Sequence, residues 1–262
     1  MWRYLDLYKH LVSFSLKTSM QFRLDFFFRI IMDCVFYSMH FVFFSVLTSH
    51  APQLGGWDSF QLQVLATSIC LVDAIQMTLF SNNMHFFSTQ IVKGGLDFHL
   101  VRPVSPRFMM SLKSFAFNSF VNLLIAIGIC ISILSRSPYP IQAISIVWYA
   151  LSIMMGAFIY YNFQFAIRSL VFWTHSGNAL NGLTYTLDKL GEKPHTVYPK
   201  WFQKFFTTLL PYALVASVPS QILVTDSPFL LLLSMVGGSL FTFGISQWIW
   251  VTGLDRYQSA SS

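Results

Sequence analysis

The stretch STQIVKGGLDFHLVRPVSPRFM, residues 88–109, decides how the rest of the chain is interpreted. It is the longest polar interruption between hydrophobic segments in the first half of the chain, and the segments on both sides are apolar enough to cross a membrane. Two adjacent glycines and two prolines divide it. Because glycine permits and proline forces a break in a helix, we predict a short, bounded structure between two membrane crossings.

The composition is that of a membrane protein. Hydrophobic residues make up 55% of the 262 residues, charged residues make up 10%, and phenylalanine occurs 28 times. A soluble domain contains fewer hydrophobic and more charged residues. A crossing needs about 20 residues, so the chain has room for about six crossings and for no sizeable soluble domain. We therefore expect an all-α integral membrane protein with a single transmembrane domain, residues 1–262.

Common catalytic and ligand-binding motifs are absent from the sequence. It contains no phosphate-binding loop, no Gly-x-Ser-x-Gly and no His-Glu-x-x-His. The cysteines lie in apolar segments without metal-ligand spacing, and the formal charge of +6 is spread over connecting segments rather than gathered in a basic stripe. We expect no catalytic residue, no metal site, no cofactor bound by this chain and no nucleic acid partner. The amino terminus does not fit a cleavable signal peptide, so we expect it to be retained.

The chain divides into a first helix, six predicted crossings, a loop and a hairpin. Residues 2–22 place apolar and aromatic side chains opposite charged ones, which predicts a helix lying in the membrane interface, packed against the rest of the protein, or both. The predicted crossings are residues 26–48, 60–84, 110–134, 141–167, 171–190 and 228–252. Turns rich in glycine and proline separate them.

The last third of the chain departs from this simple pattern. Residues 171–190 contain Asn178, Asn181 and other polar residues, so we expect this crossing to be sheltered by neighbours or to line a cavity. Prolines divide residues 194–223 into pieces that are each too short to span a bilayer. These pieces are predicted to form re-entrant or interfacial helices on one side of the membrane.

The distribution of basic residues predicts the orientation. If both termini are cytoplasmic, 11 of the 16 Lys and Arg residues lie on the cytoplasmic side and 5 lie outside. Cytoplasmic connections carry the excess of basic residues in membrane proteins. The loop 88–109 is therefore predicted to be cytoplasmic, and the hairpin 194–223 is predicted to be external.

Two acidic residues within the predicted crossings need partners, because a charge near the bilayer centre costs several kcal/mol unless it is paired or hydrated. Asp33 follows Arg29 by four residues, and this spacing predicts an ion pair on one helical face. Asp73 has no comparable partner in its own helix. It is the best candidate for a polar cavity or an interhelical hydrogen bond, with direct contact to a substrate as the alternative.

The glycines and prolines of the loop predict where its helices break and restart. Gly94-Gly95 permits a break after the second crossing, and residues 96–101 can form one or two helical turns with Leu96, Leu100 and Val101 on one face. Arg102-Pro103 should leave the helical region, and Ser105-Pro106 predicts an N-cap followed by proline at the first helical position. We predict a short helix that presents an apolar surface and receives mechanical work from a partner; an idle polar loop is the alternative.

The pattern G-x-L-D-x-x-L-x-R-P-V-S over residues 94–105 resembles the cytoplasmic loop of bacterial permease subunits of type-2 ABC exporters, in particular a branch of small six-crossing permeases. The residues that carry it are Gly94, Leu96, Asp97, Leu100, Arg102, Pro103, Val104 and Ser105. The likeness extends over most of the chain, to the Tyr-Pro and Leu-Pro pairs at residues 198–199 and 210–211 and to the ending at residues 253–261.

The resemblance implies a multi-pass subunit of the bacterial cytoplasmic (inner) membrane. Such a subunit dimerises with itself or with a related permease and binds two ABC ATPase subunits, which hold ATP and Mg. The loop would be the coupling helix that contacts the ATPase, through Gly94, Gly95, Leu96, Asp97, Leu100, Arg102, Pro103 and Ser105. The hairpin would close the pathway from outside, with Pro199, Trp201, Pro211, Tyr212 and Pro219 as the gate.

Two other functions stay open at this point. The first is an integral membrane acyl- or glycosyl-transferase that uses His85, Asp97 or His99 on the cytoplasmic face, and it would turn over without an ATPase. The second is a membrane partner of an ATPase that signals and does not transport. Co-purification of an ATP-binding subunit separates the transferase from the other two.

Overall fold

Helices make up most of the structure that is described. A computed structural model describes residues 2–50, 56–191, 193, 195–208, 210–225 and 227–258. Within these ranges the chain forms helices and no strand, which confirms the all-α prediction for them. The predicted gate residues Pro199, Pro211 and Pro219 all lie within the described ranges, whereas Pro194, at the start of the predicted hairpin, lies outside them.

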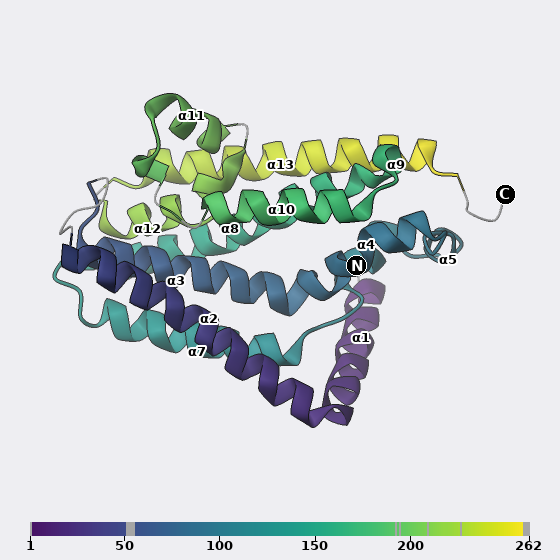
Figure 1. Ribbon diagram of the computed structural model, residues 1–262, viewed down its shortest axis with the longest axis horizontal. Coiled ribbons are helices and arrows are strands. Elements are labelled where there is room, and N and C mark those ends of the chain that lie inside the picture. Colours follow the sequence, from purple (N-terminus) through teal and green to yellow (C-terminus); the bar gives the residue numbers. More distant parts are fainter. Residues whose placement is uncertain are drawn as a thin grey trace.

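Long apolar helices run along the long axis of the molecule (Figure 1). They are α2 (Arg23–His50), α3 (Ser59–Gln76), α7 (Phe117–Leu134), α8 (Ala143–Ser169) and α13 (Phe229–Arg256). α3 continues through a π-helical turn, η1 (Met77–Ser81), into α4 (Asn82–Val92). In the described chain 5 helical segments are long and apolar enough to cross a membrane: Arg23–Leu47, Ser59–Val92, Phe117–Leu134, Ala143–Thr174 and Phe229–Arg256.

The predicted fifth crossing, residues 171–190, is not a single helix. It consists of α9 (Val171–Thr174) and α10 (Gly177–Gly191), separated by His175 in the left-handed conformation with φ 50°. α10 has 15 residues, fewer than the roughly 20 needed to span a bilayer. It nevertheless returns the chain along the long axis beside α8, so α13 runs back toward the α4 end (Figure 1). Among the described residues, five segments and not six are therefore long and apolar enough for a full crossing.

The third crossing also starts later than residue 110. α6 (Pro106–Leu112) ends and α7 begins only at Phe117, because the turn between them is bound to α4 and η1. Asn83 accepts hydrogen bonds from the Ser114 backbone nitrogen and hydroxyl, both at 3.0 Å. The Ala116 nitrogen donates to the carbonyl of Thr78, which lies in the π-helical turn, at 2.9 Å. A π-turn that releases a backbone carbonyl thus fixes a break in the neighbouring helix.

The first helix, α1 (Trp2–Gln21), lies across the long helices and meets α2 in a sharp elbow (Figure 1). The Tyr4 and Tyr8 rings pack edge-on against Phe108, and the Ser15 hydroxyl accepts a hydrogen bond from the Phe115 nitrogen at 3.1 Å. α1 is therefore packed on the protein, in the transverse orientation that an interfacial helix needs.

Short helices form both ends of the long axis (Figure 1). α5 (Asp97–Leu100) lies at one end. The other end holds η2 (His195–Val197), α11 (Lys200–Thr208), η3 (Pro211–Leu214) and α12 (Ser217–Val224), which occupy the predicted hairpin.

The core lies between α3, α8, α12 and α13. Leu62, Ile159, Ile222 and Met235 are each 0% exposed. Large apolar side chains on the outer faces of α2 and α13 are instead exposed, as befits surfaces that face lipid. Buried polar groups find partners across helices: the Ser68 hydroxyl is 2.8 Å from the hydroxyl of Tyr149.

Candidate functional site

The loop between α4 and α6 begins at a glycine that has a left-handed backbone. Gly94 has φ 75°, a conformation that costs a residue with a side chain about 1 kcal/mol or more. Its nitrogen donates to the Ile91 carbonyl at 3.2 Å, which closes the last turn of α4. A Cβ on Gly95 would lie 3.2 Å from the Gln90 carbonyl oxygen. The two glycines thus end the helix at Val92, two turns after the predicted end of the crossing at residue 84.

α5 lies between the two predicted breaks, but its apolar residues are not all on one face. Leu96 is 0% exposed and packs among buried residues of α4, α6 and α8, whereas Leu100 is 43% and Val101 is 83% exposed. The prediction of a shared face is therefore wrong, because Leu96 precedes the helix and lies beneath it. Phe98, 71% exposed, takes its place in the exposed cluster. Phe98 lies between the polar residues Asp97 and His99, so the helical periodicity of apolar residues did not reveal it.

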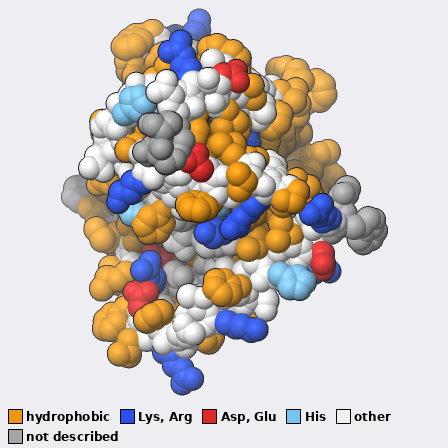
Figure 2. Space-filling view, turned by 90° about the vertical axis from the view of Figure 1, so that its right-hand side faces the viewer, with side chains coloured by type: hydrophobic (Ala, Val, Ile, Leu, Met, Phe, Trp, Pro, Cys, Tyr) orange, Lys and Arg blue, Asp and Glu red, His pale blue; other side chains and the backbone are white. Residues whose placement is uncertain are grey.

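Charged residues surround this exposed cluster. Lys93 and Arg102 are exposed, and Asp97 is half-buried beside Tyr257 near the end of the described chain. Burial and the carboxylate of Asp97 raise the pKa of the Tyr257 hydroxyl to about 12. Figure 2 views this end of the molecule and shows Lys and Arg side chains spread among hydrophobic ones. The tip of the loop is thus an apolar surface with a mainly basic rim.

The loop ends where Pro106 starts α6. Pro103 lies just before this restart, and Ser105 occupies the N-cap position, but the Ser105 side chain makes no capping hydrogen bond. Its backbone nitrogen donates instead to the Tyr4 hydroxyl of α1 at 3.1 Å. The loop is therefore attached to the first helix as well as to the long helices.

Arg107, which the sequence interpretation treated only as a loop cation, connects the loop to α8 and α13. One guanidinium nitrogen donates to Gln247 Oε1 at 2.6 Å. The other donates to Asn162 Oδ1 at 2.7 Å and to Ser246 Oγ at 2.9 Å. The guanidinium carbon also lies 4.4 Å from the centroid of the Phe165 ring, a cation–π contact. Nothing in the local sequence indicates this destination, since the partners are 55 to 140 residues away.

Asp73 and the predicted gate residue Tyr212 line the same cavity, of about 90 Å³. The Tyr37 hydroxyl of α2 donates to Asp73 Oδ2 at 3.2 Å, an interhelical hydrogen bond of the kind expected for Asp73. The Tyr212 hydroxyl donates to Asp188 Oδ1 at 2.9 Å. Asp188, in α10, belongs to the polar run that was expected to be sheltered or to line a cavity, but the sequence did not single it out over Asn178 and Asn181. Aromatic residues and His40 complete the walls: Phe36, His40 and Tyr160.

Asp188 is compensated by a chain of polar contacts on α8. The amide nitrogen of Gln164 donates to Asp188 Oδ1 at 2.9 Å, and its amide oxygen accepts from Arg168 at 2.5 Å. The spacing Gln164–Arg168 is a helical i, i+4 pair that a sequence can reveal. Its connection to Asp188 across 24 residues could not be derived from that spacing.

The remaining predicted polar residues are more scattered. Asn178 is exposed, Asn181 is half-buried, and neither lines the Asp73 cavity. At the other end, Trp201 is 70% exposed on α11, whereas Pro219 is buried within α12. The structure thus brings Asp73 together with one gate residue, Tyr212, and leaves the two asparagines elsewhere.

The predicted ion pair between Arg29 and Asp33 is replaced by another. Arg29 Nε donates to Asp25 Oδ2 at 2.8 Å, and Asp33 Oδ2 accepts from the Asn122 amide of α7 at 2.6 Å. Asp25 and Asp33 are both four residues from Arg29, so helical spacing alone cannot choose between them. The Asn122 amide, which donates to Asp33 from α7, leaves Asp25 as the ion-pair partner of Arg29.

The histidines proposed for a transferase have unlike surroundings. His85 is exposed and its ring lies edge-on to Phe86. His99 is 6% exposed, and its Nδ1 has no hydrogen-bond partner within the described chain. Burial, together with the nearby charges of Lys113 and Arg102, lowers the pKa of His99. A buried, uncharged imidazole beside two cations is poorly placed to exchange protons with a substrate.

A protein family described as ABC-2 family transporter protein matches residues 34–261 of the chain. The match includes the loop, the Asp73 cavity and the short helices at the other end, and begins after α1. Curated proteins and solved structures gave no match. The apolar helices and this match together make the chain a multi-pass membrane protein, and it belongs to the ABC-2 transporter family, whose members are permease components of ABC transporters and in general work with an ABC ATPase.

Proposed function

We propose that the chain is the membrane-spanning permease of an ATP-driven ABC exporter and that ATPase subunits drive it through residues 94–105. The exposed apolar cluster of α5, Phe98, Leu100 and Val101, carries this proposal. Apolar side chains gathered at a tip with a polar rim are characteristic of a protein interaction site. Two ATPase subunits would hold ATP and Mg, and this chain would supply the route and bind no cofactor itself.

The attachment of the loop supports a mechanical role. α4 is continuous with α3 over Ser59–Val92, so a push on α5 acts on a long apolar helix directly. Arg107 and its polar partners extend this connection to α8 and α13. Movement at the tip would therefore reach three of the long helices without passing through a flexible linker.

The pathway is proposed to form between two permeases, either two copies of this chain or this chain and a related one. The Asp73 cavity lies between α2, α3, α8 and the short helices of the hairpin, so a movement of the long helices would change its shape. Tyr212 would then gate it, with Asp188 holding the tyrosine hydroxyl. Asp73 may be replaced by Asn to ask whether it contacts the substrate: unchanged transport would assign it a structural role.

The proposed orientation rests on the arrangement of the ends and on the basic residues. α1 begins and α13 ends at the same end of the long axis as α5 (Figure 1). With the excess of basic residues, this supports both termini and the loop on the cytoplasmic side of a bacterial inner membrane. The short helices α11 and α12 would then be external, and transport would be directed outward.

The test is ATP hydrolysis by the permease–ATPase complex purified in mild detergent and reconstituted in vesicles. Leu100→Asp puts a carboxylate into the proposed contact, and Gly94→Pro is incompatible with φ 75°. Both should leave membrane insertion intact and abolish transport-linked hydrolysis. Val197→Asp, at an exposed apolar position at the opposite end, is the matched control and should retain it.

Two results would overturn the proposal. Leu100→Asp could retain full coupled hydrolysis, which would mean that α5 does not transmit work. Alternatively, the chain could purify without an ATP-binding subunit and catalyse group transfer alone, which would support the transferase.

A further inference from the structure

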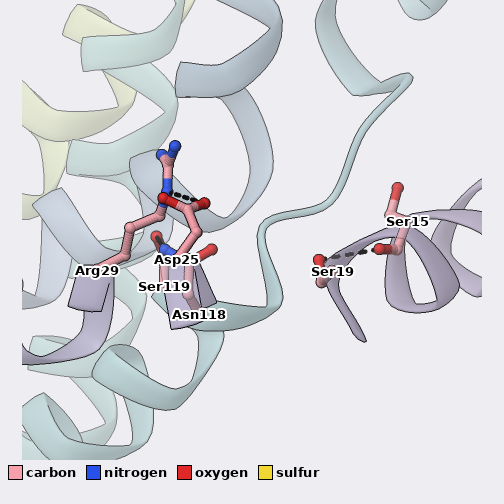
Figure 3. A network of polar contacts seen from close by, with 6 residues as sticks. All are labelled: Ser15, Ser19, Asp25, Arg29, Asn118 and Ser119. Atoms are coloured by element: carbon pink, nitrogen blue, oxygen red, sulfur yellow. Dashed lines mark hydrogen bonds and ion pairs between the residues drawn. The ribbon is translucent and has the colours of Figure 1, made fainter. Parts of the chain in front are cut away.

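A second cavity, much larger than the one at Asp73, lies between α1, the start of α2, α4, α6 and α7. Its volume is about 570 Å³, within the usual range of a ligand pocket, about 300–1,000 Å³. Figure 3 shows side chains from its two sides: Ser15 and Ser19 on α1, and Asp25, Arg29 and Asn118 on α2 and α7. We call it the elbow groove, because the elbow between α1 and α2 forms one wall.

The elbow groove has an extensive apolar wall. Phe14 is 70% exposed, Phe22 is 65% exposed and Phe86 is 58% exposed, and all three line it together with Met109 and Phe26. Covering such aromatic side chains with apolar groups is favourable by roughly 25 cal/mol per Å² of apolar surface relative to water. Their accumulation in one groove therefore suits an apolar occupant such as an acyl chain.

The polar wall of the elbow groove is cationic. Arg29 forms its ion pair with Asp25, and these two charges cancel. Lys113 lines the same groove and is exposed, and within the described chain no carboxylate lies within ion-pair distance of its ammonium group. The charges on the groove therefore sum to a single positive one, surrounded by the hydroxyl and amide groups of Ser19, Asn82 and Asn118.

The position of the elbow groove restricts its occupant. α1 lies across the apolar helices, where an interfacial helix meets lipid headgroups. Basic pockets between membrane helices at this level bind anionic headgroups. A lipid supplies an acyl chain and a charged phosphate in one molecule, whereas a soluble anion leaves the aromatic wall uncovered and a neutral hydrocarbon leaves Lys113 without a counter-charge.

We propose that the elbow groove binds one anionic phospholipid, with its phosphate at Lys113 and an acyl chain along Phe14, Phe22 and Phe86. The lipid fixes the elbow between α1 and α2 against α4 and α6, which carry the loop. The wall formed by α1 and the first residues of α2 precedes residue 34, where the family match begins. The inference is independent of export and of the ATPase contact.

The experiment is a native mass spectrometry titration of the purified full chain in dodecyl maltoside. Dioleoylphosphatidylglycerol is the probe and dioleoylphosphatidylcholine is its neutral counterpart. We expect one phosphatidylglycerol to be retained per chain, with phosphatidylcholine bound at least about tenfold more weakly, because the choline cation offsets the charge that its phosphate presents to Lys113.

Substitutions separate the parts of the proposed site. Lys113→Gln should weaken phosphatidylglycerol binding about tenfold and weaken phosphatidylcholine binding by clearly less. Lys17→Gln removes the same charge from an exposed position on α1 outside the groove and should change neither. Phe86→Ser, at an exposed position that tolerates a small side chain, should weaken both lipids.

Three outcomes overturn the proposal. Equal retention of the two lipids removes the charge selectivity, and equal effects of Lys113→Gln and Lys17→Gln reduce it to general surface attraction. Displacement of the lipid by glycerol 3-phosphate at the same concentration would show a headgroup site with no acyl component. Size-exclusion profiles of every variant, measured first, separate loss of binding from loss of fold.

Discussion

The two ends of the long axis are both built from short helices, yet large apolar side chains are exposed at one end and buried at the other. We call residues 93–106 the loop end, and residues 195–208 with 210–225 the hairpin end. At the loop end Phe98 is 71% and Val101 is 83% exposed. At the hairpin end Phe206 is 1% and Ile222 is 0% exposed. The hairpin end completes the core, and the loop end leaves a surface for a partner.

The difference arises in the long helices and not in the short ones. α8 has a glycine, Gly156, where the hairpin end approaches it: a Cβ there would lie 2.6 Å from the Val215 carbonyl oxygen. Gly238 of α13 similarly receives the Leu214 side chain, which a Cβ would meet at 2.3 Å. Because these glycines have no side chain, the hairpin end packs closely against α8 and α13. At the loop end Leu96 turns inward, and the tip beyond it projects past the long helices.

The same substitution made at both ends should give the largest contrast. Phe206→Ala removes a fully buried ring that packs against Tyr212 and Phe202, and a cavity of that size costs about 3–5 kcal/mol. Phe98→Ala removes an exposed ring and should leave stability within about 0.5 kcal/mol. Thermal unfolding of both variants in detergent measures the contrast.

Trp201→Ala is the control within the hairpin end, since that side chain is 70% exposed on the same helix as Phe206. It should resemble Phe98→Ala in stability. Equal destabilisation by Phe206→Ala and Phe98→Ala would remove the distinction between the two ends.

Arg107 tests how firmly the loop end is attached. Arg107→Met keeps much of the side-chain volume but removes the donor to Asn162, Ser246 and Gln247, of which Asn162 Oδ1 keeps its hydrogen bond from the Ser246 hydroxyl. A buried polar group left unsatisfied costs about 1–3 kcal/mol, so we expect a loss in that range in unfolding free energy, chiefly from Gln247. Chemical unfolding in mixed micelles gives the value.

Arg102→Met is the matched control, because Arg102 is exposed on the same loop. It should change stability little while weakening binding of the ATPase. If Arg107→Met reduced the unfolding free energy as little as Arg102→Met, the contacts of Arg107 would not hold the loop, and its attachment would rest on α1 and α4.

Local rules of helix formation predicted the breaks of the loop but not its attachments. Gly94 takes the positive φ that only glycine adopts easily, and Pro106 takes the first helical position, and both follow from neighbouring residues. The partners of Arg107 lie on two helices far away in the sequence. Nothing in the spacing of one helix encodes which groups face it from another.

The same limit explains the failures within the crossings. Arg29 has an aspartate four residues away on each side, and the choice of Asp25 depends on Asn122 of α7, which takes Asp33. The polar run in residues 171–190 was visible in the sequence, but the left-handed His175 that breaks it was not. Composition and hydropathy, which depend on single residues, predicted six crossings, and long apolar helices occupy most of five of them in the described chain. Contacts between helices needed the structure.

Gly94→Ala tests the break itself and should have a smaller effect. Alanine at φ 75° is strained by about 1 kcal/mol, so stability should fall by that amount and coupled hydrolysis should decrease without being lost. Gly128→Ala, in α7 with open space around the added Cβ, is the control and should not destabilise. Unfolding midpoints of the pair give the comparison; a fall at Gly128 equal to that at Gly94 contradicts the assignment of strain.

The smallest expected effect is the part of the pH dependence that His99 contributes at the loop end. Burial, with Lys113 and Arg102 nearby, lowers the pKa of His99 below its ordinary value, so the unfolded chain binds more protons than the folded one between the two pKa values. Stability contributed by neutral His99 is therefore present above the unfolded pKa of about 6.5 and is lost as the pH falls through that value toward the folded pKa. His99→Gln should reduce the decline in melting temperature between pH 7.5 and 5.5 and leave the part due to His195, whose pKa burial also lowers, whereas His85→Gln, at an exposed position, should leave the whole decline. A decline as large in His99→Gln as in the unmodified chain would show that His99 does not contribute to it.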